Sequence, residues 1–137
     1  MEKEEIVNKL KALRLDVDGV VVYGSGAMVL RGVKEKASDI DLIARGEVWE
    51  ECKKMGKLAE CESGVGERII VDEKIEIFNL CPWEKVGDLF KGSDLIEGIR
   101  VTSLENVKRY KKERMWEKDK KDLKLIEDFE RDLKEQN

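Results

Sequence analysis

The stretch that decides the predicted fold is residues 23–45, YGSGAMVLRGVKEKASDIDLIAR. It follows three consecutive valines at 20–22, which are typical of a buried strand. The glycines at 24 and 26 allow a tight turn and a close approach of the backbone to another group. The apolar run after them predicts a short helix, and the alternation from residue 39 onward predicts a second strand. The stretch therefore predicts a strand, a helix and a strand in close succession.

Two aspartates in this stretch suggest a cation site. Alternation along the second strand puts Asp39 and Asp41 on one face and Ile40 on the other. Carboxylates held side by side repel each other, and a divalent cation relieves that repulsion. The free N–H groups at the start of the short helix would favour phosphate oxygens. The alternative interpretation, a pair of aspartates that merely caps a turn at the strand start, stays open.

The pattern of Gly24-Ser25 followed by Asp39-Ile40-Asp41 resembles the nucleotidyltransferase superfamily, whose fold is shared by DNA polymerase beta and kanamycin nucleotidyltransferase. In that family Gly-Ser ends a strand, a short helix follows, and Asp-x-Asp lies on the neighbouring strand. The spacing resembles a branch with a longer linker, which includes abortive-infection-type nucleotidyltransferases and archaeal relatives. The residues that carry this finer resemblance are Ala27, Leu30, Gly32, Lys34 and Ser38.

The resemblance implies further site residues. The family's enzymes use a third carboxylate on a later strand, and Glu76 fits that position, although Asp is commoner there. Similar proteins often have a lysine in a later helix, followed by Lys-Asp-x-x-Asp. These positions would be Lys111 and the segment 118–122, so that Lys111 or Lys118 would approach the triphosphate and Asp122 would hold its helix against a neighbour. The alternative for this basic run is a solvated helix face.

Composition narrows the chemistry. Charged residues make up 42% of the 137, with a net charge of −4, so a broad basic surface is not indicated. The absence of histidine excludes Ser-His-Asp or Cys-His catalysis and a His-ligated zinc site. The widely spaced Cys52, Cys61 and Cys81 predict buried thiols in a reducing cytoplasm. No apolar run reaches the length of a membrane span, so we expect no membrane partner. Abundant lysine and glutamate resemble thermophile composition.

The periodicities predict the remaining elements. Helices are expected over 2–14, 26–31, 47–55 (with Gly56 as its C-cap) and 117–135, and another opens at 103–106 with Ser103 or Thr102 as N-cap. Strands are expected over 17–23, 39–44, 57–61, 68–71, 74–80 and 99–102. The segment from Pro82 to Gly98 is expected to be irregular.

These observations together predict a single α/β (α+β) domain over residues 1–137, with a core at about 15–100 and C-terminal helices at about 103–135. We expect a mixed sheet with helices on one side. The resemblance implies transfer of a nucleoside monophosphate from a nucleoside triphosphate to a hydroxyl, with Mg²⁺ or Mn²⁺ held by Asp39, Asp41 and Glu76 and the phosphates held by Gly24, Ser25, Lys111 and Lys118.

The acceptor stays open at this point between a small molecule, a protein and a tRNA end, and a homodimer that completes an acceptor pocket stays open too. The alternatives to an enzyme are a non-catalytic nucleotide-binding module and a regulatory module of the toxin–antitoxin type.

Overall fold

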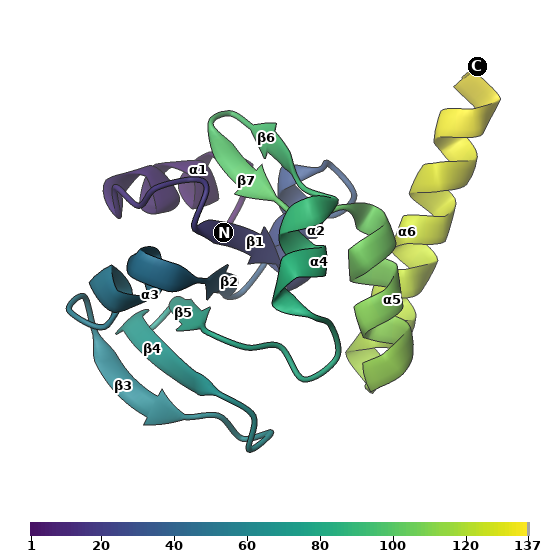
Figure 1. Cartoon of the computed structure of the whole chain (residues 1–137). Coiled ribbons are helices and arrows are strands. Elements are labelled where there is room, and N and C mark those ends of the chain that lie inside the picture. Colours follow the sequence, from purple (N-terminus) through teal and green to yellow (C-terminus); the bar gives the residue numbers. More distant parts are fainter. Residues whose placement is uncertain (137) are drawn as a thin grey trace.

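The computed structural model describes residues 1–136, which form one seven-stranded sheet and six helices (Figure 1). The strand order is β3-β4-β5-β2-β1-β7-β6. The strands are β1 (Val20–Tyr23), β2 (Ile40–Ala44), β3 (Lys57–Glu60), β4 (Glu67–Asp72), β5 (Ile75–Phe78), β6 (Asp94–Ile96) and β7 (Ile99–Val101). The helices are α1 (Lys3–Ala12), α2 (Gly24–Leu30), α3 (Gly46–Cys52), α4 (Val86–Lys91), α5 (Leu104–Arg114) and α6 (Glu117–Gln136).

The sheet is mixed, as the sequence predicts. β1 pairs with β2 in the antiparallel sense, while β2–β5 and β1–β7 are parallel pairs. Antiparallel hairpins complete both edges, β3–β4–β5 at one and β6–β7 at the other. The predicted strand–helix–strand unit is therefore the centre of the sheet, because β1 and β2 are its neighbouring inner strands.

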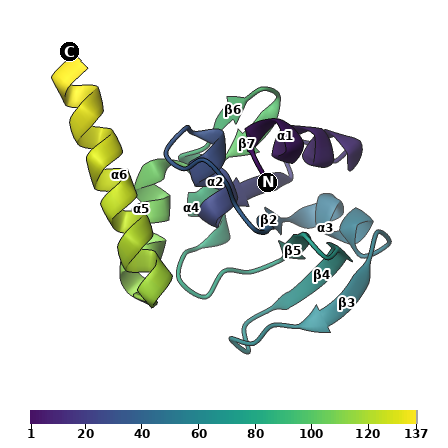
Figure 2. The same cartoon turned by 180° about the vertical axis from the view of Figure 1, so that it is seen from behind.

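Alternation along the strands creates two apolar layers. Val22, Ile40 and Leu42 belong to the larger one, which α1, α2 and α3 cover. Val21 and Ile43 face the opposite side, where the smaller layer contains side chains of α4 and α5. The expectation that the helices lie on one side of the sheet is therefore wrong, since α4 packs on the other face (Figure 2).

The stretch predicted to be irregular contains α4 and β6, which the sequence analysis missed. Leu89 and Phe90 are buried and attach α4 to the sheet. Gly92 ends this helix, and Gly98 turns the chain from β6 into β7 with a φ of 81°. Both elements are short, and two glycines beside them obscured the periodicity that reveals a helix or a strand.

The role predicted for Gly56 is also wrong. Helix α3 ends at Cys52 and Lys53 is its C-cap. A Cβ atom at Gly56 would lie 2.2 Å from the backbone oxygen of Ile70 on β4. Glycine is therefore required there by the close approach of two backbones.

The C-terminal helices form the predicted pair. The Ser103 hydroxyl accepts a hydrogen bond from the backbone N–H of Asn106, so Ser103 is the N-cap of α5. Met115, at a φ of 51°, separates α5 from α6. The C-terminal part of α6 extends beyond α5 in both views (Figures 1 and 2).

The cysteines and the lengths of the apolar helices bear on two further predictions. Cys52 and Cys81 are buried as predicted, whereas Cys61 is half-buried. Within residues 1–136, no helix is both long enough and apolar enough to cross a bilayer.

Candidate carboxylate site

Three strands bring the predicted site residues into one row. Tyr23 of β1 lies opposite Asp41 of β2, and Asp41 lies beside Glu76 of β5. Neighbouring strands are about 4.8 Å apart, and side chains at the same register point to the same face. That face carries the smaller apolar layer. The carboxylates of Asp41 and Glu76, which are far apart in the sequence, are therefore neighbours in the sheet. We refer to Asp39, Asp41 and Glu76 as the carboxylate site.

Asp41 is the most perturbed of these residues. Its side chain is half-buried at the start of β2. Burial, followed by the nearby charge of Glu76, raises its pKa from 3.8 to about 6, and Asp39 acts in the same direction. Lys118 and Arg114 oppose this increase in pKa. A carboxylate whose charged form is disfavoured to this extent is typical of functional sites.

Neither aspartate has a polar partner in the described chain. Within residues 1–136, no hydrogen bond or ion pair reaches the side chain of Asp39 or Asp41. Asp39 lies one residue before β2 and is exposed. The negative charge at this point is therefore not neutralised by direct contact with the protein's own cations.

Gly24 brings the backbone of α2 close to Asp41. A Cβ atom at Gly24 would lie 3.5 Å from the Asp41 Oδ2 atom, which is an ordinary van der Waals separation. Its φ of 67° explains the glycine, since other residues rarely adopt this conformation. Ser25 follows and is half-buried. The structure thus brings Gly24 to the carboxylate site, as the sequence pattern predicts.

Glu76 has a partner that the sequence analysis missed. The Arg68 guanidinium of β4 donates a hydrogen bond from Nη1 to the Glu76 Oε2 atom at 3.2 Å. The Nε atom of Arg68 is buried and has no hydrogen-bond partner among residues 1–136. The cross-strand position of Arg68, on a strand that pairs with β5, could have been inferred only from the register of the predicted hairpin.

The two lysines predicted to hold phosphate lie in different surroundings. Lys111 is buried, with its ammonium 2.9 Å from Asp122 and 3.5 Å from Asp119, so that its contacts join α5 to α6. Asp122 also accepts a hydrogen bond from Lys34, and it therefore holds α6 in the way that the sequence analysis expects. Lys118 is exposed, and its ammonium lies 5.6 Å from the centre of the Trp116 ring. The charge of Lys118 acts to lower the pKa of Asp41, whereas Lys111 is committed to the aspartates of α6.

Arg114 is a second residue that the sequence analysis missed. Its guanidinium donates to both carboxylate oxygens of Asp119, with Nε–Oδ2 and Nη2–Oδ1 distances of 2.8 and 2.5 Å. It also donates a hydrogen bond to the Tyr110 hydroxyl and lies over the Trp116 ring at 4.1 Å. Burial raises the pKa of Tyr110, and the charge of Asp41 adds to this increase. Arg114 therefore connects the α5–α6 pair electrostatically to the carboxylate site.

The donor set of the site suits a hard divalent cation. Carboxylate oxygens are the ligands that Mg²⁺ prefers, and both aspartates lack a protein partner within residues 1–136. In the same part of the chain, no group of three or more His, Cys, Asp or Glu side chains is arranged so that it could hold a metal ion. The case for a cation at this site therefore depends on the two aspartates, which have no partner within residues 1–136, and on their uncompensated negative charge.

Comparisons of the chain with models of protein families, with curated proteins and with solved structures find no match. The carboxylate site and the sequence pattern that surrounds it are therefore the features that point to a function.

Proposed function

We propose that the protein is a metal-dependent nucleotidyltransferase, which moves a nucleoside monophosphate from a nucleoside triphosphate to a hydroxyl group and releases pyrophosphate. The observation that carries the proposal is the row Tyr23–Asp41–Glu76, in which Asp41 has a raised pKa and no polar partner within residues 1–136. The order of Gly24-Ser25 and Asp39-Ile40-Asp41 in the sequence supports it. Mg²⁺ or Mn²⁺ would be held by the carboxylate site.

The protein's own residues have separable tasks in this proposal. The aspartates provide negative charge, and Lys118 and Arg114 favour the ionised form of Asp41. Lys118 also offers positive charge to the phosphate oxygens of a nucleotide that lies against the site. Each nitrogen of Arg114 already donates to Asp119 or Tyr110. When bound, Mg²⁺ would polarise the phosphate under attack and neutralise charge on the leaving pyrophosphate.

The bond changes are those of phosphoryl transfer. A bond forms between the acceptor oxygen and the α-phosphorus, and the bond from the α-phosphorus to the oxygen that bridges to the β-phosphate breaks. The hydroxyl proton passes to a carboxylate, for which Glu76 is the proposed acceptor.

One contact favours a second function. Because Arg68 binds the Glu76 carboxylate at 3.2 Å, Glu76 is engaged in an ion pair and not free for a metal ion. A protein in which this pair persists would bind a nucleotide through the two aspartates without turning it over. We therefore keep a non-catalytic nucleotide-binding module as the second candidate.

Calorimetric titration with each of the four ribonucleoside triphosphates, with and without Mg²⁺, tests the proposal. We expect binding that requires Mg²⁺ in the wild type and in Glu73→Gln, a surface control that removes one negative charge elsewhere. The double variant Asp39→Asn/Asp41→Asn should lose this Mg²⁺-dependent nucleotide binding. Nucleotide binding that is unchanged in the double variant would refute the site.

Pyrophosphate release separates the two candidates. Incubation with the bound nucleotide, Mg²⁺ and mixtures of hydroxyl acceptors should release pyrophosphate if the protein is a transferase. Arg68→Gln frees the Glu76 carboxylate and should increase that release. Binding without pyrophosphate release from either protein, with every acceptor class, favours the binding module.

A further inference from the structure

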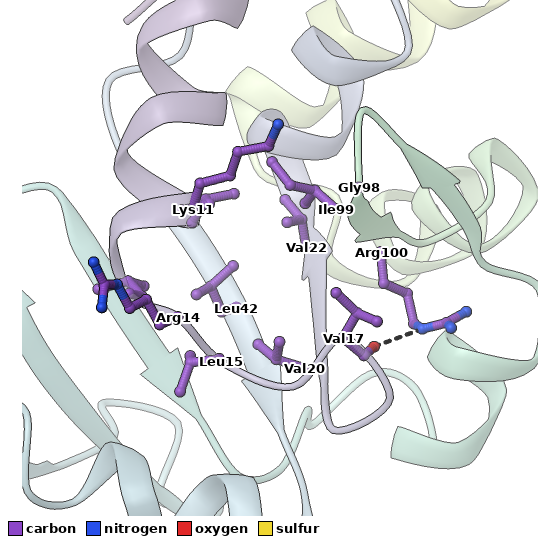
Figure 3. A pocket seen from close by; sticks show the side chains of 12 residues that line it. Lys11, Arg14, Leu15, Val17, Val20, Val22, Leu42, Gly98, Ile99 and Arg100 are labelled. Atoms are coloured by element: carbon purple, nitrogen blue, oxygen red, sulfur yellow. Dashed lines mark hydrogen bonds between the residues drawn. The ribbon is translucent and has the colours of Figure 1, made fainter.

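A cavity lies between α1 and the sheet. It has a volume of about 190 Å³ and is lined mainly by aliphatic side chains of α1, of β1 and β2, and of the segment that leads into β1. Figure 3 shows Leu42, Val22 and Val20 along its floor and Leu15 beside them. The cavity is therefore an apolar space against the sheet, and its lining also includes Lys11, Arg14 and Arg100.

This cavity lies on the opposite face of the sheet from the carboxylate site. Val22 and Leu42 belong to the larger apolar layer, whereas their chain neighbours Tyr23 and Asp41 point to the other side. A molecule in the cavity would thus contact the residues next to Tyr23 and Asp41 without entering the carboxylate site. The cavity is not a part of the nucleotide site proposed above.

Cationic side chains surround its mouth, and they differ in how they are bonded. The Arg100 guanidinium donates to the Val17 carbonyl oxygen at 2.7 Å, to Ser93 and to Asp18, so that each of its three nitrogen atoms already donates a hydrogen bond. Within residues 1–136, no hydrogen bond or ion pair engages the side chain of Lys11 or of Arg14. Lys11 and Arg14 are therefore two exposed cations beside an apolar cavity, with no partner in the described part of the chain.

Lys11 is the better placed of the two. Its side chain extends from α1 toward β7, and its Cε atom lies 3.9 Å from the position that a Cβ atom would take at Gly98 (Figure 3). The aliphatic stem of Lys11 thus covers the edge of the cavity while its ammonium stays in water. The Arg14 guanidinium points away from Leu42 in Figure 3. A bound anion would therefore meet Lys11 first.

We propose that this cavity binds a medium-chain aliphatic carboxylate, with its carboxylate beside the Lys11 ammonium and its hydrocarbon chain against Val22 and Leu42. The unpartnered cations set the charge of the ligand, and the aliphatic lining sets its apolar part. An engineered apolar cavity of about 150 Å³ holds one benzene molecule. A cavity of about 190 Å³ accordingly takes roughly six to eight carbons.

A series of ligands tests the proposal without reference to nucleotides. Affinity for butanoate, hexanoate and octanoate should increase by about fourfold for each added methylene, and decanoate should gain little more because its last carbons leave the cavity. Octylammonium, with the same chain and the opposite charge, should bind at least tenfold more weakly than octanoate. In methyl-labelled protein, resonances of Val20, Val22 and Leu42 should shift and saturate, while those of Ile43 and Leu89 on the opposite face should not.

Matched variants of α1 test the head group. Lys11→Met retains an unbranched stem but removes the charge, and should weaken octanoate binding by about threefold to fivefold. Lys9→Met makes the same change two residues away, where the lysine lies 3.9 Å from Asp72, and should leave octanoate binding unchanged. Asp41→Asn should also leave it unchanged, so that failure of the nucleotide proposal does not affect this one.

Three results would overturn the proposal. The first is the absence of saturable shifts at the cavity methyl groups with any member of the series. The second is equal affinity for octanoate and octylammonium. The third is a dimer in solution whose dilution shifts the same methyl resonances, because a second copy of the chain would then cover the cavity.

Discussion

Replacing Asp41 by asparagine should stabilise the protein at neutral pH. Its pKa is raised from 3.8 to about 6 in the folded protein, chiefly by burial and by Glu76. The folded state therefore holds the proton more tightly than the unfolded chain, and stability decreases as the pH rises from about 4 to above 6. At about 1.4 kcal/mol for each pKa unit, the cost of ionised Asp41 at pH 7 is about 3 kcal/mol at most. Asp41→Asn removes that cost, and we expect a gain of about 1–3 kcal/mol, since the amide must still be desolvated.

Urea denaturation of the wild type and Asp41→Asn at pH 7.5 and pH 4 measures this effect. The free energy of unfolding of the variant should exceed that of the wild type at pH 7.5. The difference should shrink at pH 4, because Asp41 of the folded wild type is then protonated and, like the asparagine of the variant, uncharged. Glu73→Gln, an exposed control, should change it by less than about 0.5 kcal/mol at either pH. Addition of Mg²⁺ should stabilise the wild type but not Asp41→Asn. A variant that is less stable than the wild type at pH 7.5 without metal would refute the reasoning, because Asp41 would then contribute a favourable interaction.

Three further predictions concern the scaffold, and each is measured by urea denaturation at pH 7. Lys111→Met should lower the free energy of unfolding by about 3–5 kcal/mol, because it leaves two buried aspartates of α6 without this cation; a loss below about 1 kcal/mol would mean that the remaining cations compensate. Gly56→Ala should cost at least about 1–3 kcal/mol, since the added methyl group meets the Ile70 backbone oxygen. Gly87→Ala is the control, because Gly87 of α4 has open space around it, and this variant should stabilise the protein by about 0.5–1 kcal/mol. Equal effects of the two substitutions would mean that contact with the Ile70 oxygen does not explain the glycine at 56. Ser103→Ala should cost about 1 kcal/mol through loss of the N-cap of α5, while Ser103→Thr should largely preserve stability.

The sequence predicted the central elements because their signals are local. The valines before Tyr23 and the alternation around Asp41 identify β1 and β2, and the glycine at 24 marks the turn between the strand and the helix. The hairpin that contains Glu76 was predicted from two β-rich runs joined by a short turn, and the structure confirms it. Register within the sheet then brings Asp41 and Glu76 together, since strand periodicity fixes which face each residue occupies.

Contacts between distant segments were not predictable in the same way. Arg68 reaches Glu76 across a strand pair, and Arg114 binds Asp119 from the preceding helix, but neither arginine differs from a surface residue in its local sequence. Lys111 lies in a basic run that is typical of a solvated face, yet it is buried with Asp122. A charged residue is buried when a partner of opposite charge meets it, and that partner is set by the tertiary fold.

The C-terminal helices matter for the carboxylate site through charge, although they lie outside the sheet. Lys118 and Arg114 both lower the pKa of Asp41, and Arg114 is held in place by its paired hydrogen bonds with Asp119. Loosening α6 would withdraw Lys118 and release Arg114 of α5 from Asp119, and the pKa of Asp41 would then rise above about 6. Protonated Asp41 is a poor metal ligand. The buried ion pairs of Lys111 therefore stabilise the α5–α6 pair and, through it, keep Asp41 ionised near neutral pH.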